Sequence, residues 1–132
     1  MEEKAILNEF KETAANSLDY LRDWKSRTGK KILGYFCTNT PEEIIHAAGF
    51  LPVRILSSPT TISLAAKHLQ SYSCSLVQSS LEAALRGDLN FLDGTVFPHT
   101  CDSIQRLSDI WSENMKLPKR SLRRYWDEIP AP

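Results

Sequence analysis

The stretch Gly94-Thr95-Val96-Phe97-Pro98-His99-Thr100-Cys101-Asp102 predicts a buried strand that leads into the start of a helix, with Cys101 at the joint. A thiol at a helix N-terminus lies near the positive end of the backbone dipole, which favours the thiolate, the form that binds metals or attacks electrophiles. Two further cysteines, Cys37 and Cys74, occupy similar joints in the sequence. We therefore expect three thiols at junctions between elements.

Short apolar segments alternate with amphipathic segments along the rest of the chain. Strand formers are concentrated in residues 31–37 and 51–56, and helical spacing covers about 2–27, 42–48, 73–85 and 102–114, with one or two helical turns over 62–69. Strands separated by helices favour parallel pairing in a layered fold. The pattern predicts an α/β three-layer sandwich with a small parallel sheet, of the Rossmann or flavodoxin-like kind.

The composition fits one compact domain. The chain has 132 residues, of which 42% are hydrophobic, which is enough for a core but too short for two ordinary domains. We expect the domain to cover residues 1–115 and a basic, proline-containing tail to cover residues 116–132. We interpret the tail as a solvated helix that touches the body, in preference to a patch that binds phosphate groups.

Charge and hydropathy argue against two classes of partner. Lysine plus arginine and aspartate plus glutamate both total 16, so the net charge predicts binding neither to nucleic acid nor to an anionic membrane. No apolar run approaches the roughly 20 residues that a membrane helix needs, and the charged opening Met1-Glu2-Glu3-Lys4 is unlike a secretory signal. We therefore expect a cytoplasmic protein.

The three cysteines are either inert buried thiols or ligands. Ligands of an open parallel sheet gather outside the carboxyl ends of its strands. Cys37 ends the first predicted strand, Cys101 follows the third, and Cys74 begins a helix near the same edge. Zinc is the less favoured metal, because structural zinc sites usually use Cys-x-x-Cys knuckles and this chain has none. Three thiolates also suit a four-iron cluster, with one iron left open to act as a Lewis acid.

Three separated motifs carry a resemblance to a known family. They are Gly34-Tyr35-Phe36-Cys37 followed by TPEEIIHAAGFLPVR at residues 40–54, then Ser73-Cys74, and then Pro98-His99-Thr100-Cys101-Asp102. In this order the motifs resemble the 2-hydroxyacyl-CoA dehydratase and benzoyl-CoA reductase family, from about residue 31 to residue 111. Three motifs in the family's order are far more specific than any one of them.

The resemblance implies that Cys37, Cys74 and Cys101 ligate a [4Fe–4S] cluster in an oxygen-sensitive, cytoplasmic enzyme of anaerobes. It also implies an acyl-CoA substrate, a paired homologous subunit, and an ATP-dependent iron–sulfur activator or electron-donating subunit. Family members use low-potential electrons, either for radical dehydration of a 2-hydroxyacyl-CoA thioester or for reduction of an aromatic thioester ring. We therefore expect the [4Fe–4S] subunit of such an enzyme, or an N-terminal fragment of that subunit.

Glu43 is the candidate catalytic residue. Its position is similar to that of an acidic residue near the family's cluster, where it can act on a proton during elimination. The residues themselves offer an alternative of equal weight: Thr40 as N-cap, Pro41 at the first helical position and Glu43 at the third form a capping box. A capping residue can also face the pocket, so both interpretations stay open.

The chain departs from the family in its length. Family subunits are much longer and contain a second α/β domain that completes the substrate pocket, so the resemblance implies an incomplete copy of a two-domain subunit. The alternative functions are a non-catalytic iron–sulfur domain for electron transfer or docking, and a double-cubane cluster protein that reduces small molecules. These alternatives share the cysteine ligands and differ in whether the chain binds an acyl-CoA.

Overall fold

The computed structural model describes residues 2–57 and 60–115, so the predicted basic tail lies outside the described residues. The chain divides after Lys30 into two compact units, residues 1–30 and residues 31–132. Among the helices of the described residues, none is long and apolar enough to cross a membrane.

The first unit consists of two helices, α1 (Glu2–Ala15) and α2 (Ser17–Thr28). The prediction of one continuous helix is wrong because the backbone leaves helical geometry at Asn16, where φ is −114° and ψ is 35°. A short amide side chain competes with the helix for backbone hydrogen bonds, and Nδ2 of Asn16 donates to the carbonyl oxygen of Glu12 at 3.3 Å. Gly29 ends α2 in the left-handed conformation, as the sequence predicts.

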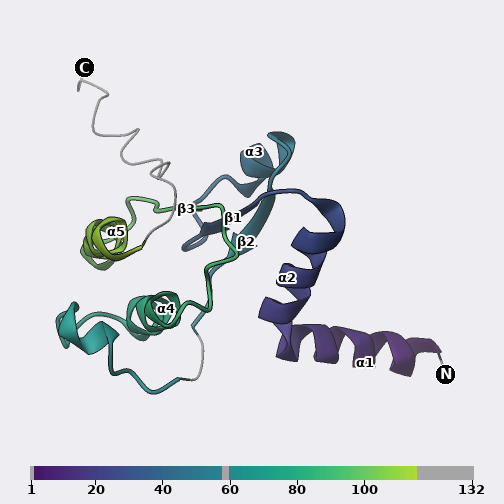
Figure 1. Ribbon diagram of the computed structural model, residues 1–132, viewed down its shortest axis with the longest axis horizontal. Helices are drawn as coiled ribbons and strands as arrows, with labels where there is room; N and C mark the ends of the chain where they lie inside the picture. The colour runs from purple at the N-terminus through teal and green to yellow at the C-terminus, as the bar shows by residue number, and fades with distance from the viewer. Residues whose placement is uncertain (1, 58–59, 116–132) are drawn as a thin grey trace. The chain divides into compact units, whose positions relative to one another are not determined.

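The second unit is built on a three-stranded parallel sheet (Figure 1). Its strands are β1 (Ile32–Tyr35), β2 (Leu51–Arg54) and β3 (Gly94–Val96), in the order β2-β1-β3. Its helices are α3 (Glu42–Ala47), the short 3-10 helix η1 (Ala65–Lys67), α4 (Ser75–Arg86) and α5 (Asp102–Asn114). The predicted α/β class with a small parallel sheet is confirmed.

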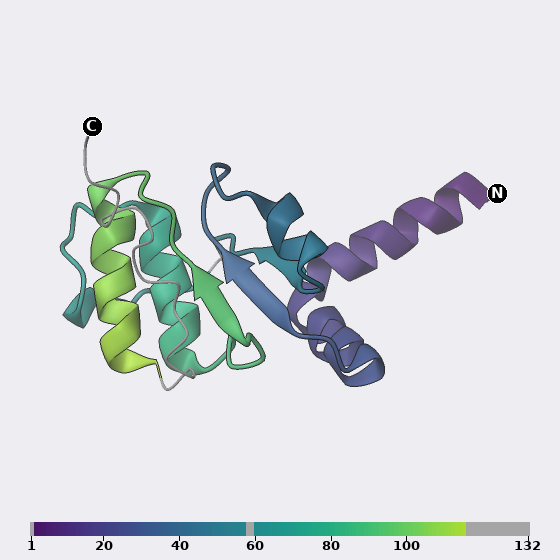
Figure 2. The same cartoon turned by 90° about the horizontal axis from the view of Figure 1, so that it is seen from above.

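Helices cover both faces of the sheet (Figure 2). The α3 helix packs beside β2 on one face, and α4 and α5 lie side by side on the other. The preferred right-handed crossover accounts for this arrangement, because the chain moves from β1 to β2 and then crosses back over β1 to reach β3. The strand order reverses between β1 and β3, which in flavodoxin-like sheets is the switch point where ligands bind at the carboxyl edge.

The core of the second unit is formed by β1 and by one face each of α4 and α5. The largest fully buried apolar side chains are those of Ile32, Phe36, Val77, Leu81, Ile104 and Leu107. On α5 the buried residues are Ile104, Leu107 and Trp111, the spacing of three to four that predicts an amphipathic helix. Each such burial stabilises the fold by about 1.5–3 kcal/mol. The central strand is therefore held firmly against the two helices that carry Cys74 and Cys101 at their starts.

Gly34 lies in the middle of β1, where the packing leaves no room for a side chain. A Cβ atom there would lie 2.8 Å from Cδ1 of Ile55 and 2.9 Å from Cδ1 of Leu92, both on buried residues. Gly34→Ala is expected to lower the free energy of unfolding by roughly 1–2 kcal/mol, because overpacking outweighs the entropy gained by removing a glycine. The change is measured from urea unfolding of the full chain followed by circular dichroism.

The control for this substitution is the double variant Gly34→Ala/Ile55→Val. Valine lacks the Cδ1 atom that the new methyl group would meet, so the double variant should lose less stability than the sum of the two single losses. Additive losses would show that close packing is not the cause, and a fully stable Gly34→Ala variant would contradict the predicted cost.

Candidate functional site

Cys37 follows β1 in a strained backbone conformation. Its φ is 59°, and among the described residues it is the one residue other than glycine with a positive φ. This left-handed geometry costs a residue with a Cβ atom roughly 1–2 kcal/mol, and such costs cluster at functional sites. The half-buried thiol is thus placed beyond the end of the central strand by a backbone that a cysteine does not prefer.

Cys74 and Cys101 lie at helix starts, as the sequence predicts, and the structure makes them the N-cap residues of α4 and α5. Figure 2 shows the two helices side by side, with their first turns at the end toward which the arrows of β1 and β3 point. Both thiols are exposed, and both N-cap residues have extended backbone geometry. All three cysteines therefore lie on segments at the carboxyl edge of the sheet, and the segments of Cys37 and Cys101 flank the switch point between β1 and β3.

A side-chain contact joins the segments that carry Cys37 and Cys101. The hydroxyl of Thr100, the residue before Cys101, donates a hydrogen bond to Sγ of Cys37 at 3.6 Å. These two residues are 63 positions apart in the sequence. The loops after β1 and β3 thus touch at the site itself.

Three aromatic rings form what we call the three-ring cluster: Phe36 and Phe97, which begin the loops after β1 and β3, and Trp111. Phe36 stacks on Phe97 with a centroid distance of 5.0 Å, and Trp111 presents an edge to both rings at 5.7 and 5.6 Å. Phe36 immediately precedes Cys37, Phe97 lies four residues before Cys101, and Trp111 belongs to α5. Aromatic pairs of this geometry add about 0.5–1.5 kcal/mol beyond their burial. The three-ring cluster fixes the loops that carry Cys37 and Cys101 relative to α5.

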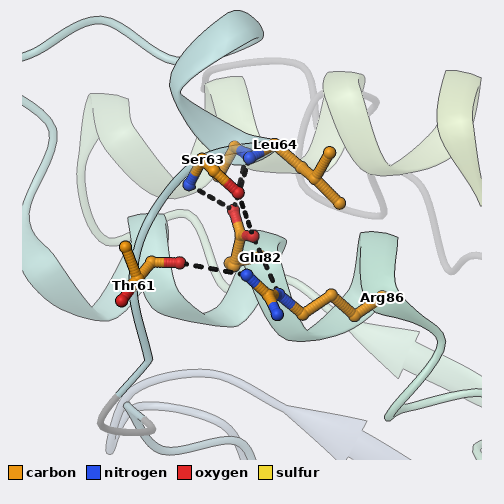
Figure 3. Close-up of polar contacts among 6 residues, drawn as sticks. Thr61, Ser63, Leu64, Glu82 and Arg86 are labelled. Carbon is orange, nitrogen blue, oxygen red and sulfur yellow. Dashed lines mark hydrogen bonds and ion pairs between the residues drawn. The ribbon is translucent and has the colours of Figure 1, made fainter.

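The segment before Cys74 is held by a buried carboxylate (Figure 3). The Glu82 side chain is fully buried in α4, and its Oε2 atom accepts hydrogen bonds from the backbone N–H groups of Ser63, Leu64 and Ala65 at 2.8–3.0 Å. Its Oε1 atom accepts from Oγ of Ser63 at 3.1 Å and from Nε of Arg86 at 2.9 Å. The backbone N–H groups, led by that of Ala65, hold the pKa of Glu82 down at about 2, although burial opposes this shift.

Two further contacts extend this anchor toward Cys74. Arg86 donates from Nη2 to the carbonyl oxygen of Thr61 at 3.2 Å. Nε2 of Gln78 donates to the carbonyl oxygen of Ser73 at 2.8 Å. Both ends of the segment from Thr61 to Ser73 are thereby tied to α4, so the position of Cys74 is set by the helix that it caps.

Tyr35 and Glu42 form a polar pair on the other side of Cys37. The Tyr35 hydroxyl donates to Oε2 of Glu42, and this hydrogen bond, together with burial, raises the pKa of Tyr35. Arg54 lies opposite Tyr35 in the register of β1 and β2, and its positive charge acts to lower the pKa of Tyr35. Tyr35 therefore stays protonated and holds the first residue of α3 against the end of the strand.

The predicted capping box at the start of α3 is wrong. The N-cap residue is Pro41, and no side chain caps the helix. Thr40 is buried and its Oγ1 atom donates instead to the carbonyl oxygen of Phe36 at 3.0 Å, because that buried carbonyl lies outside the sheet ladder and needs a donor. Glu43 is exposed in the first turn of α3, and its charge contributes to raising the pKa of Tyr35. Its interpretation as a capping residue is thus removed, and its catalytic role stays a prediction.

The chemistry of the three thiols decides which kind of metal group they could hold. In the described part of the chain, no group of three or more His, Cys, Asp or Glu side chains could hold one metal ion. A [4Fe–4S] cluster makes a different demand, because each thiolate binds a different iron atom. Three unpaired cysteines at one sheet edge are the donor set that such a cluster takes.

Several residues of the site escape sequence reasoning. Glu82 and Arg86 are four apart on a helix and read as an ordinary solvated pair, although the glutamate is fully buried. The contact between Thr100 and Cys37 depends on the register of β1 and β3, which the sequence does not encode locally. The helical spacing of Trp111 with Ile104 and Leu107 is the one signal that could have pointed to the three-ring cluster.

Fold and site together define an α/β protein with three free thiols at the carboxyl edge of its parallel sheet. The profile of the family described as 2-hydroxyglutaryl-CoA dehydratase, D-component, matches residues 37–129, and the chain belongs to this family. The resemblance carried by the three cysteine motifs is thereby confirmed at the level of the family.

Three relatives show the range of the family. The chain is 37% identical over 109 residues to the beta subunit of lactoyl-CoA dehydratase of Anaerotignum propionicum, covering 82% of this chain and 29% of the relative. It is 34% identical over 112 residues to the (R)-phenyllactyl-CoA dehydratase beta subunit of Clostridium sporogenes, covering 85% and 29%. It is 35% identical over 109 residues to a benzoyl-CoA reductase subunit of Thauera aromatica, covering 80% and 28%. The match therefore spans less than a third of each relative.

Proposed function

We propose that this chain is the cluster-binding part of a subunit of a 2-hydroxyacyl-CoA dehydratase or benzoyl-CoA reductase. The observation that carries the proposal is that Cys37, Cys74 and Cys101 lie at the carboxyl edge of the sheet, with the loops of Cys37 and Cys101 in contact. Family membership supports it, because relatives named as dehydratase and reductase subunits match over most of this chain.

In this proposal the three cysteines hold a [4Fe–4S] cluster. When bound, such a cluster supplies single electrons and, at an iron without a protein ligand, a Lewis acid for an oxygen atom. The chain's own contribution is to hold the thiols in place. Cys37 is set by the strand end and the three-ring cluster, Cys74 by the Glu82 anchor, and Cys101 by α5.

Glu43 is the carboxylate that we propose for proton transfer. It lies in the first turn of α3, six residues after Cys37, and its side chain is exposed. The neighbouring Glu42 is engaged by Tyr35, so the two carboxylates have different roles. Glu42 fixes α3 to the strand end, and Glu43 exchanges a proton with the substrate.

The acyl-CoA substrate and the partners belong to the same proposal. The relatives carry the names of acyl-CoA enzymes and of their subunits, which supports a CoA thioester as substrate and a paired homologous subunit. The proposed system also includes an ATP-dependent iron–sulfur activator, or an electron-donating subunit, in the cytoplasm of an anaerobe.

Iron binding tests the proposal directly. Anaerobic reconstitution of the full chain with iron and sulfide should give a brown protein with about four irons and four sulfides per chain. Cys37→Ser, Cys74→Ser and Cys101→Ser should each lose most of the bound iron, because each removes one thiolate ligand. Iron and sulfide are determined chemically on the desalted protein.

Ser75→Ala is the matched control, because Ser75 is exposed and directly follows Cys74. It should retain the iron content of the unmodified chain. A colourless chain without iron would contradict the proposal, as would one zinc per chain without sulfide.

A further inference from the structure

The hydroxyl of Thr100 is directed at the sulfur of a proposed ligand. Its Oγ1 atom lies 3.6 Å from Sγ of Cys37 and donates a hydrogen bond to it, a normal distance for a sulfur acceptor. Thr100 is exposed, and it is not itself one of the proposed ligands. The hydrogen-bond donor therefore belongs to the loop that carries Cys101, and the acceptor is the sulfur of Cys37.

The fold holds both partners of this contact in place. The backbone N–H of Thr100 donates to the carbonyl oxygen of Pro98 at 2.9 Å, which closes a tight turn immediately after Phe97. Phe97 stacks on Phe36, and Phe36 is bonded to Cys37. The stacked rings of Phe97 and Phe36 thus connect the turn that carries Thr100 to the residue that precedes Cys37. Cys37 has the left-handed φ of 59°, which fixes the direction in which its thiol leaves the backbone.

The effect of such a bond on a cluster follows from its electrostatics. A thiolate that ligates iron carries negative charge, and an O–H donor stabilises that charge. The charge on the sulfurs increases when a cluster accepts an electron, so a hydrogen bond to a sulfur favours the reduced cluster. Neighbours of metal ligands also fix the orientation of those ligands.

We propose that Thr100 is a positioning residue that orients the Cys37 sulfur and raises the reduction potential of the cluster which Cys37 ligates. This inference rests on the proposed function, because it needs a cluster at Cys37. It adds a residue outside the three cysteines that sets how readily the cluster accepts an electron from a reductant.

Potentiometric titration of the reconstituted full chain tests the role of Thr100. Thr100→Val removes the hydroxyl and keeps the shape of the side chain. At the potential where half of the unmodified chain's cluster is reduced, a smaller fraction of the Thr100→Val cluster should be reduced, while the iron content stays the same. Thr100→Ser keeps a hydroxyl and should titrate close to the unmodified chain.

Thr38→Val is the matched control, because Thr38 is also an exposed threonine and directly follows Cys37. Its potential should be unchanged. Equal shifts in Thr38→Val and Thr100→Val would overturn the inference, since general polarity and not the bond to Cys37 would then be the cause. Identical potentials for Thr100→Val and the unmodified chain would overturn it as well.

The failure of this inference can be told apart from the failure of the proposed function. If the unmodified chain takes up no iron and sulfide, both are overturned. If the unmodified chain holds a cluster whose potential does not respond to Thr100→Val, the cluster proposal stands and the role of Thr100 falls. A Thr100→Val chain that lost its iron would also overturn the inference, because Thr100 would then be needed for binding the cluster and not for setting the potential of an intact one.

Discussion

Replacing Phe36 by alanine is expected to lower the free energy of unfolding by about 3–5 kcal/mol. Phe36 is fully buried and contacts both other rings of the three-ring cluster, so its removal leaves a cavity between the end of β1 and α5. The free energy of unfolding of a single domain is only about 5–15 kcal/mol, so this one substitution removes a large part of the stability. Urea unfolding of the full chain, followed by circular dichroism, measures the effect.

Phe10→Ala is the control for this experiment. The Phe10 side chain in α1 is 69% exposed, so the same chemical change should alter the stability by no more than about 0.5 kcal/mol. Equal losses in the two variants would contradict the role given to the three-ring cluster. Because Phe36 precedes Cys37, the same variant should also loosen the loop that carries this thiol.

Replacing Glu82 by glutamine is expected to remove a pH-dependent part of the stability. The pKa of Glu82 is about 2 in the folded chain, against an ordinary value of 4.5. A lowered pKa means that the carboxylate stabilises the fold fully above pH 4.5 and that this contribution is lost as the pH falls toward 2. The stability difference between the unmodified chain and Glu82→Gln should therefore be largest at neutral pH and shrink across this window.

The measurement is a series of urea midpoints from neutral pH down to strongly acidic pH. Other carboxylates titrate in both proteins, so the difference between the two curves isolates Glu82. Glu113→Gln serves as the control, because Glu113 is exposed near the end of α5, and its curve should run parallel to that of the unmodified chain. A difference between Glu82→Gln and the unmodified chain that stays constant with pH would refute the assignment of a low pKa to this group.

Elements with strong local signals could be predicted from the sequence. The helix α5 spans Asp102–Asn114, as its apolar spacing predicts, and α4 ends at Gly87, whose φ of 90° suits glycine. The break at Asn16 and the role of Thr40 could not be predicted, because side-chain hydrogen bonds to backbone carbonyls compete there with simple helix rules. Local sequence patterns therefore predict amphipathic helices well, but they do not predict where a side chain takes over a backbone hydrogen bond.

The candidate site, too, has a part that local sequence predicts and a part that it does not. The positions of Cys74 and Cys101 at helix starts follow from local sequence and are confirmed, and both residues prove to be N-caps. The buried state of Glu82 and the contact of Thr100 with Cys37 require the tertiary fold, because their partners lie 17 to 19 and 63 positions away. Sequence reasoning therefore found the proposed ligands and missed the residues that hold them.

The backbone conformation of Cys37 has a consequence for protein engineering. A residue with φ of 59° is one where glycine is most comfortable, because glycine has no Cβ atom to clash. A design procedure that optimises folding alone would therefore replace this cysteine with glycine. The residue that would make position 37 most stable, glycine, therefore cannot supply the proposed cluster-binding thiol.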